Sequence, residues 1–471
     1  MLPHRLNSLK SILCLILLFC LSYSARSQWT YQITDLSSEY YRGFYEKLIQ
    51  QKTDRVFEEK KKQKGYEAVE RYQKYKLASF LAGDLIVHDT LLQNYINGLL
   101  VRIAAPNKDL IKQYPEVLIS RSGIPNAFNM GLGIIVINCG YIYQAQTEED
   151  ILICIAHELG HFLAKDAENT MEAYINLLHS KTLKDSVKDI VSARYNRFTR
   201  GEELWKQYAF EQSSHSRFRE SEADSTAAAL LRKAGIPFDA AYFLRLDSMK
   251  LTARMNFNQP LPEALLRLGW EIPTTAYEVQ ANASSRRSWG TPVKDSVEQA
   301  GMKTHPDCSE RYERTKGFTD AGQKSTPIPL EMRKAAYRHI VMYALTHNEL
   351  GEAFFLLLQE TRYSDSTEQK LWGQLLARKL ILAHRKMSRI KAINVRATED
   401  CSKDYNQVQT LLTRLPEPAL KNITMSTTET ANGEWQYAIR SLDALSVKPE
   451  HQEKHLLSDA YPCSPLNEIM N

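Results

Sequence analysis

The sequence has few of the features that mark membrane, disulfide-rich or nucleic-acid-binding proteins. One apolar run of 11 residues lies near its start, and no other stretch reaches about 18 apolar residues, so we expect no membrane-spanning helix in the mature chain. The seven cysteines include no C-x-x-C pair and therefore indicate no thiolate zinc knuckle. The formal net charge of +5 in 471 residues is small, which does not indicate a protein that binds nucleic acid. With 43% hydrophobic and 24% charged residues, the composition is that of a globular protein.

The short apolar run lies in a segment that is typical of an export signal. Arg5 and Lys10 precede an apolar run over residues 11–21, and small residues follow up to Ser27. We therefore predict a secretory signal peptide over residues 1–27, with an uncleaved anchor as the alternative. Cleavage after Ser27 would remove three basic residues and lower the formal charge from +5 to +2. The predicted location is periplasmic or otherwise extracytoplasmic.

Polarity and periodicity distinguish the two ends of the rest of the chain from its middle. The residues after 28 are polar and rich in lysine and glutamate, which predicts an N-terminal helical arm over residues 28–84. The middle combines helical periods with short strands, and beyond about 328 the chain is helical again, which predicts a helical C-terminal region over residues 317–471. In this last part, T-H-N-E-L-G predicts the turn of a helical hairpin, and no second copy of that unit follows at a fixed period.

Local signals predict several helices around two short strands. Residues 116–120 and 133–138 are β-branched runs, and the glycine-containing connection between them predicts a turn or a bulged edge. Thr147 begins a helix, with Asp150 as its capping partner. Further helices are expected from Leu91 to just before Pro106, over about 167–197, and over 218–235 with Gly235 as the stop.

The segment C-I-A-H-E-L-G-H-F-L places two histidines four residues apart on the helix that Thr147 begins. His157 and His161 therefore share one face of the helix and could bind one ion together. Imidazole nitrogens suit Zn²⁺, and Glu158 beside the first histidine could act as general base for an attacking water. Two histidines do not complete such a site, because a catalytic zinc takes three protein ligands and keeps one open position.

The spacing of a third ligand distinguishes the classes of zinc peptidase. A metzincin would need a glycine and a histidine where this chain has Ala164 and Ala167. A thermolysin-type enzyme would need a glutamate at the spacing where Ser180 stands. The best candidate is Glu220, on a strongly helical segment, with Asp224 one turn further along. A carboxylate at that second position could fix the orientation of a ligand histidine.

Together these motifs resemble the HtpX-like and CAAX-prenyl-endopeptidase family of zinc peptidases. H-E-L-G-H is followed about sixty residues later by E-x-E-A-D, as in that family. N-A-F at residues 126–128, a glycine-containing strand and T-E-E-D precede it in the family's order. Downstream, the H-P-x-x-x-x-R segment ends at Arg311. The resemblance covers about residues 85–315 and implies that 85–316 is a zinc metallopeptidase domain.

The resemblance implies a fold and a set of site residues. The fold would be α+β and mainly helical, with a zincin-type core, a small sheet and a helical C-terminal region. One Zn²⁺ would be bound by His157, His161 and Glu220. Glu158 would be the general base, and Asp224 would lie beside a ligand histidine. Arg311 would stabilise the oxyanion, and His305 would either aid the oxyanion or block the zinc. An edge strand that pairs with substrate would contain Asn126, Ile134, Ile135 and Val136.

The resemblance also implies a function in the cell envelope. Membrane-embedded members have several spans, which this chain lacks, so it is more similar to the exported soluble branch of the family. We therefore predict a zinc-dependent endopeptidase that hydrolyses unfolded or misassembled polypeptides in protein quality control. An envelope protein could bind to the C-terminal helices. The alternative is a zinc-containing chaperone or assembly module with little or no proteolysis, which binds partners through those helices.

Overall fold

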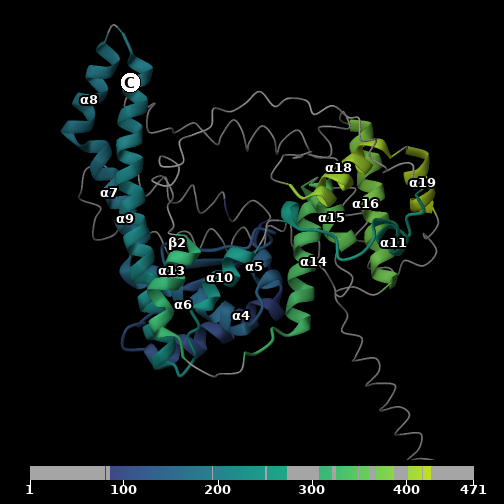
Figure 1. Ribbon diagram of the computed structural model, residues 1–471, viewed down its shortest axis with the longest axis horizontal. Coiled ribbons are helices and arrows are strands. Elements are labelled where there is room, and N and C mark those ends of the chain that lie inside the picture. The colour runs from purple at the N-terminus through teal and green to yellow at the C-terminus, as the bar shows by residue number, and fades with distance from the viewer. Residues whose placement is uncertain are drawn as a thin grey trace, which may run out of the picture.

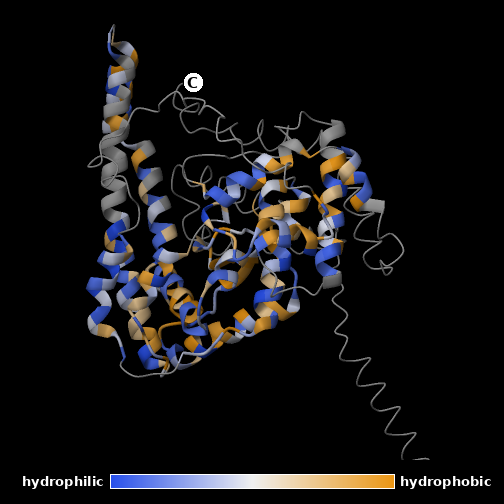
Figure 2. Ribbon diagram, turned by 45° about the vertical axis from the view of Figure 1, so that its right-hand side comes forward, coloured by the Kyte–Doolittle hydropathy of each residue, from blue (hydrophilic) through white to orange (hydrophobic). Residues whose placement is uncertain are grey.

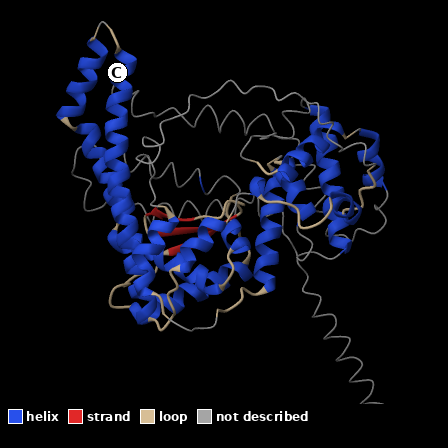
Figure 3. Ribbon diagram, viewed as in Figure 1, coloured by secondary structure: helices blue, strands red, loops and turns tan. Residues whose placement is uncertain are grey.

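Helices surround one small sheet in the computed structural model of the chain (Figure 3). The structure describes residues 80, 85–193, 195–249, 252–272, 307–320, 325–347, 349–359, 366–386, 401–415 and 417–425. The predicted signal peptide, all but one residue of the predicted N-terminal arm, and His305 lie outside the described residues. Within them, the many helices and one three-stranded sheet confirm the predicted α+β, mainly helical fold.

The sheet has the strand order β1-β3-β2, with β3 in the middle. The strands are β1 (Glu116–Ser120), β2 (Ala127–Gly131) and β3 (Ile134–Asn138). β1 runs parallel to β3, and β2 runs antiparallel to it, with a register shift between Asn129 and Gly131. The glycine-containing connection of the sequence therefore contains a strand of its own, and its predicted form as a bulged edge is confirmed.

The strand predicted to pair with substrate is the middle strand and not an edge. β3 pairs with a neighbour on each side, and Ile134, Ile135 and Val136 are fully buried. Because both neighbours bond to its backbone, β3 cannot add an extended substrate, and this prediction was wrong. Asn126 lies just before β2, where its carbonyl accepts a hydrogen bond from the Asn138 amide over 3.0 Å. Its contact with substrate stays a prediction.

Two helices with well-formed N-termini pack beside the sheet: α4 (Thr90–Ala104) and α6 (Glu148–Ala164). The Asp89 carboxylate caps α4 by accepting hydrogen bonds from the amides of Leu91 and Leu92. Thr147 and Asp150 form the predicted capping box at the start of α6. All residues of α6 from Ile151 to Gly160 are buried, so its polar residues lie inside the protein and not on a solvated face.

After α6 the chain forms a helical arm that extends away from the core (Figure 1). The arm consists of α7 (Asp166–His179), α8 (Lys181–Ser192) and the first part of α9 (Arg197–Lys233). The stretch predicted over about 167–197 is thus divided at Ser180, whose hydroxyl caps α8. Gly235 ends α9 as predicted, with a φ of 66°. None of the described helices, including α9, is long and apolar enough to cross a membrane.

The second half of α9 packs directly against α6. A Cβ atom at Gly160 would lie 2.9 Å from the Cα and 3.0 Å from the carbonyl oxygen of Ala223. Only glycine fits at this position, and the small alanine opposite it also lets the two backbones approach. The glycine of H-E-L-G-H and the alanine of E-S-E-A-D therefore form one contact, which fixes the spacing of the helices that carry these motifs.

Three shorter helices complete the core: α5 (Cys139–Gln144), α10 (Ala241–Ser248) and α13 (Cys308–Thr315). Arg245 on α10 donates hydrogen bonds from Nη2 and Nε to Asp150 Oδ1, over 2.7 and 2.9 Å. This pair ties α10 to the first turn of α6. α13 packs against α10 and α9, and so carries Arg311 to the inner side of both.

The helices of the C-terminal region share one apolar core with the rest of the described residues (Figure 2). They are α14 (Leu330–Thr346), α15 (Leu350–Gln359), α16 (Ser366–Lys386), α18 (Lys403–Arg414) and α19 (Glu417–Met425). α14 and α15 are the predicted hairpin, and Arg333 on α14 donates to the carbonyls of Tyr143, in the last turn of α5, and of Ala145, just after it. α11 (Leu261–Arg267), from before the predicted boundary, packs on α15 and α16. The two parts therefore interleave, and the boundary at 316 stays a prediction.

Replacing Gly160 by alanine should separate α6 from α9. The added methyl group would meet backbone atoms of Ala223, so we expect the free energy of unfolding to fall by about 1–3 kcal/mol in urea denaturation. The control is Gly98→Ala on α4, where nothing lies within 4 Å of the added Cβ. Because Gly98 is exposed within a helix, this substitution should stabilise the protein by about 0.5–1 kcal/mol. Equal stabilisation by both variants would contradict the proposed close contact.

Candidate metal centre

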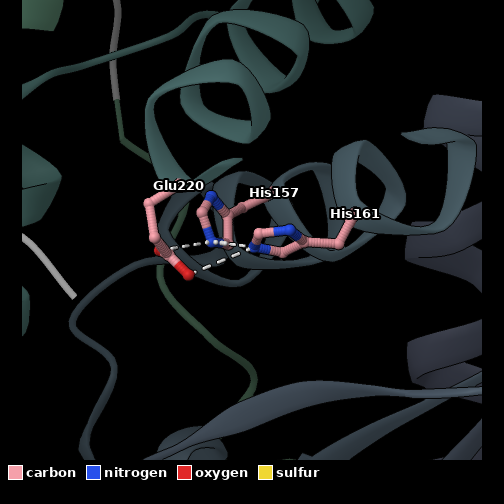
Figure 4. A group of neighbouring side chains, drawn as sticks. All are labelled: His157, His161 and Glu220. Atoms are coloured by element: carbon pink, nitrogen blue, oxygen red, sulfur yellow. Dashed lines mark hydrogen bonds and ion pairs between the residues drawn. The ribbon is translucent and has the colours of Figure 1, made fainter. Parts of the chain in front are cut away.

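His157 and His161 from α6 point toward Glu220 from α9 (Figure 4). The two Nε2 atoms lie 3.2 Å apart. Glu220 Oε2 lies 3.4 Å from His157 Nε2, and Glu220 Oε1 lies 3.4 Å from His161 Nε2. One donor atom from each residue thus lies within 4.8 Å of the others, and no other group of three such donors occurs among the described residues.

These separations match the geometry of a zinc site. Two ligand atoms about 2.05 Å from one ion, at the tetrahedral angle, are about 3.3 Å apart. The separation of the two Nε2 atoms, and of each Nε2 atom from one oxygen of the Glu220 carboxylate, are all close to this value. Two imidazoles and one carboxylate are also a donor set that catalytic zinc takes. The residues fit the metal that the sequence implies.

The electrostatics of the cluster also favour a cation. Burial lowers the pKa of His161, but the carboxylates of Asp166 and Glu220 outweigh it and raise the pKa to about 10. Burial likewise opposes charge on His157, yet Asp224 and Glu220 raise its pKa above the usual value. In the absence of metal, the surrounding carboxylates thus hold positive charge on the ring nitrogens. The same carboxylates would attract a metal ion to this point.

The Nδ1 atom of His157 contacts a buried ion pair, formed by Asp224 and Arg311. This atom lies 2.9 Å from Asp224 Oδ1. Asp224 also accepts hydrogen bonds from Arg311 Nη2 and Nε, over 2.5 and 2.9 Å. Burial raises the pKa of Asp224, but His157 and Arg311 outweigh it and keep the carboxyl ionised. The guanidinium carbon lies 4.4 Å from the centroid of the Phe243 ring, which completes a fixed support for Asp224.

Arg311 is buried within the site and paired with Asp224, and only 6% of the residue is exposed. Its Nη2 lies 3.2 Å from His157 Nδ1, 3.5 Å from His157 Nε2 and 3.8 Å from Glu220 Oε2. A group that stabilises the oxyanion has to face the substrate on the open side of the metal. The geometry makes Arg311 a partner of Asp224, and its role as a stabiliser of the oxyanion stays a prediction. The contact with Asp224 depends on the packing of α13 against α9, which no spacing in the sequence reports.

One functional contact was missed by the sequence reasoning. His161 Nδ1 lies 2.7 Å from Asp166 Oδ2, so both histidines have a carboxylate behind them. The only signal for it in the sequence is an acid five residues after the second histidine. On a continuous helix that position is on another face, so the contact was not predictable without the break at Lys165.

Glu158 is buried on α6, one residue after His157. Its side chain lies near Cys154. Burial raises the pKa of the Cys154 thiol, and the nearby Glu158 raises it further. A neutral, buried thiol is suited to packing in the core more than to binding a metal. The roles of Glu158 as base and of the three residues as ligands stay predictions at this point. The role of His305 stays one too, because that residue lies outside the described residues.

A buried His-His-Glu set on two crossing helices, beside a small sheet, defines the class of the protein as a metallopeptidase. Residues 88–319 match the model of a known family, described as Peptidase family M48. The chain therefore carries a domain of peptidase family M48, a family whose members depend on zinc. Its helix α6, the sheet and the parts of α9 and α13 that bear site residues all lie within the matched range.

A curated protein of Vibrio cholerae serotype O1 is similar to part of the chain. It is named "Putative beta-barrel assembly-enhancing protease" and is 27% identical over 192 residues. The match covers 38% of this chain and 38% of the relative, so the chain spans well under half of the relative's length. The likeness supports the peptidase class and the branch of the family that the sequence resembles.

Replacing Arg311 by methionine should separate its two candidate roles. Without Arg311, Asp224 would remain a buried charge paired only with His157, so we expect the free energy of unfolding to fall by about 3–5 kcal/mol. Zinc affinity, measured by competition with a chelator, should fall by about 10–100-fold, because His157 loses its support.

The matched control is Arg314→Met, on the exposed side of the same helix. Its ion pair with Glu310 is exposed, so this change should alter the free energy of unfolding by less than about 1 kcal/mol. If Arg311→Met kept full stability and zinc affinity but lost turnover, the result would support the oxyanion role and contradict the positioning one.

Proposed function

We propose that the chain is a zinc-dependent endopeptidase that cleaves unfolded or misassembled polypeptides in the cell envelope. One observation carries the catalytic part of this proposal: the Nε2 atoms of His157 and His161 lie 3.2 Å apart, each 3.4 Å from one oxygen of Glu220, and Glu158 directly follows His157. A purely structural zinc site would need no buried acid beside its ligands, so Glu158 favours the enzyme over the assembly module.

The residues around the site have separate tasks in peptide hydrolysis. Bound zinc would supply a Lewis acid for the scissile carbonyl and would lower the pKa of an attacking water. Glu158 would accept the proton from that water and pass it to the amine that leaves. Asp224 accepts the hydrogen bond from Nδ1–H of His157, which leaves the Nε2 lone pair directed toward Glu220 and His161.

An extended polypeptide would bind along β2. This strand is at the edge of the sheet, bonded to β3 on one side, and it packs beside α6. Residues 127–129 are only half-buried, in contrast to β3. Pairing with an edge strand reads backbone groups more than side chains, so it suits unfolded chains of many sequences. β2 thus replaces β3 as the proposed substrate strand.

The predicted signal peptide over residues 1–27 supports the proposed location. It would deliver the protein to the envelope, where misassembled polypeptides would be its substrates. The name of the Vibrio cholerae relative links a related domain to β-barrel assembly, and binding of an envelope protein by the C-terminal helices stays a prediction. Recovery of the protein in the cytosol with residues 1–27 intact would contradict this location.

Glu158→Gln and Glu220→Ala should differ in what they lose. Glu158→Gln keeps all three proposed ligands, so we expect full zinc content by elemental analysis and at least a 1,000-fold loss of casein cleavage, on the order expected when a catalytic base is removed. Glu220→Ala removes a ligand and should lose both zinc and cleavage. Unchanged cleavage by Glu158→Gln would disprove the enzyme mechanism, and stoichiometric zinc in Glu220→Ala would place the third ligand elsewhere.

Binding of substrate to β2 can be measured in the same inactive variant. With an unfolded peptide present, Glu158→Gln should show slower hydrogen–deuterium exchange at the amides of residues 127–129, because an added strand protects edge amides. The amides of β1, at the opposite edge of the sheet, provide the internal control. Equal protection of β1, or none at β2, would contradict the proposed substrate strand.

A further inference from the structure

His161 depends on the first residue of the arm. Its Nδ1 lies 2.7 Å from Asp166 Oδ2, and both side chains are largely buried, 13% and 15% exposed. A carboxylate can only accept at this contact, so the ring nitrogen donates. Asp166 also lies in the first turn of α7, where the amide groups of the helix favour a negative charge.

The contact exists because the helix breaks between the two residues. On a continuous helix, residues five apart are about 140° apart around the axis and about 7.5 Å apart along it. Lys165 interrupts α6 with a left-handed conformation, φ 54° and ψ 39°, and α7 then starts in a new direction. A non-glycine residue adopts this conformation at a cost of about 1–2 kcal/mol, so surrounding contacts have to hold it.

Arg219 holds the first turn of α7 against α9. Its Nη1 donates to the carbonyl oxygen of Asp166 over 3.3 Å and to the hydroxyl of Thr170. The Thr170 hydroxyl in turn donates to the same carbonyl over 2.6 Å. Arg219 directly precedes Glu220 in the chain, so the residue that fixes Asp166 is adjacent to the third proposed ligand.

We propose that Asp166 is a positioning residue of the metal site, fixed by Arg219, that holds His161 in the tautomer with its proton on Nδ1. This tautomer leaves the Nε2 lone pair directed toward His157 and Glu220, where the ion would bind. The inference rests on the proposed role of His161 as a ligand. It adds that the metal site depends on the docking of α7, since Asp166 belongs to the arm and not to α6.

The test compares substitutions at Asp166 with one at Glu168, also in the first turn of α7. Zinc affinity, measured by chelator competition on the full chain, should fall about 10–100-fold in Asp166→Ala. Asp166→Asn keeps an oxygen that accepts from Nδ1–H, so it should recover most of that loss. Glu168 bonds to the Leu132 amide and does not touch His161, so Glu168→Ala should bind zinc as the wild type does. An equal loss in Glu168→Ala would show that docking of α7 alone causes the effect, and would overturn the role of Asp166.

A second measurement reports the tautomer directly. In the zinc-loaded wild type, the imidazole ¹⁵N spectrum should show His161 protonated on Nδ1, and Asp166→Ala should lose that signal or broaden it. His161→Ala separates this inference from the function on which it rests. If His161→Ala binds zinc normally, the proposed ligand set is wrong. If His161→Ala loses zinc while Asp166→Ala keeps wild-type affinity and the same ¹⁵N signal, only the role of Asp166 is wrong.

Discussion

The close approach of α6 and α9 is the constraint on which the candidate site depends. Two histidines one turn apart on α6 provide two donors, and the third has to come from a helix about sixty residues later. The donor separations of 3.2–3.4 Å allow little error in that distance. Because protein interiors are closely packed, the missing side chain at Gly160 determines how closely α9 approaches α6. The position of Glu220 on α9 therefore depends on Gly160 as well as on the residues around Glu220.

Charge balance is the second constraint, and it explains the behaviour of the histidines. The site holds the buried acids Glu158, Glu220 and Asp224, the largely buried Asp166 behind His161, and one buried guanidinium, that of Arg311. With neutral imidazoles the acids outnumber the guanidinium, and a bound cation would offset part of their negative charge. Burying unbalanced charge is costly, so in the metal-free protein protons on His157 and His161 take part of that role, and their pKa values are raised.

The metal site also connects parts of the fold that look separate in the chain. Asp166 joins it to the arm, and Arg311 joins it to α13. On the other side, the bond from Arg333 to the Ala145 carbonyl and the bond from the Glu148 amide to the Thr326 carbonyl tie the C-terminal region to the start of α6. The helix with two of the proposed ligands is therefore held at both ends by elements distant in sequence. This arrangement places the C-terminal region in contact with the domain core and not on a free linker.

Local chemistry in the sequence determined much of the fold. The capping box of α6, the apolar period of α4 and the stop at Gly235 each depend on residues close in the chain, so they could be predicted. The i, i+4 pair of histidines is local in the same sense, and the family resemblance added Glu220 and Asp224. Only the tertiary structure decided which strand lies at the sheet edge, because strand order depends on partners and not on the strand's own residues. It likewise turned Arg311 toward Asp224 and brought Asp166 to His161, since both contacts form between elements whose relative orientation no local pattern encodes.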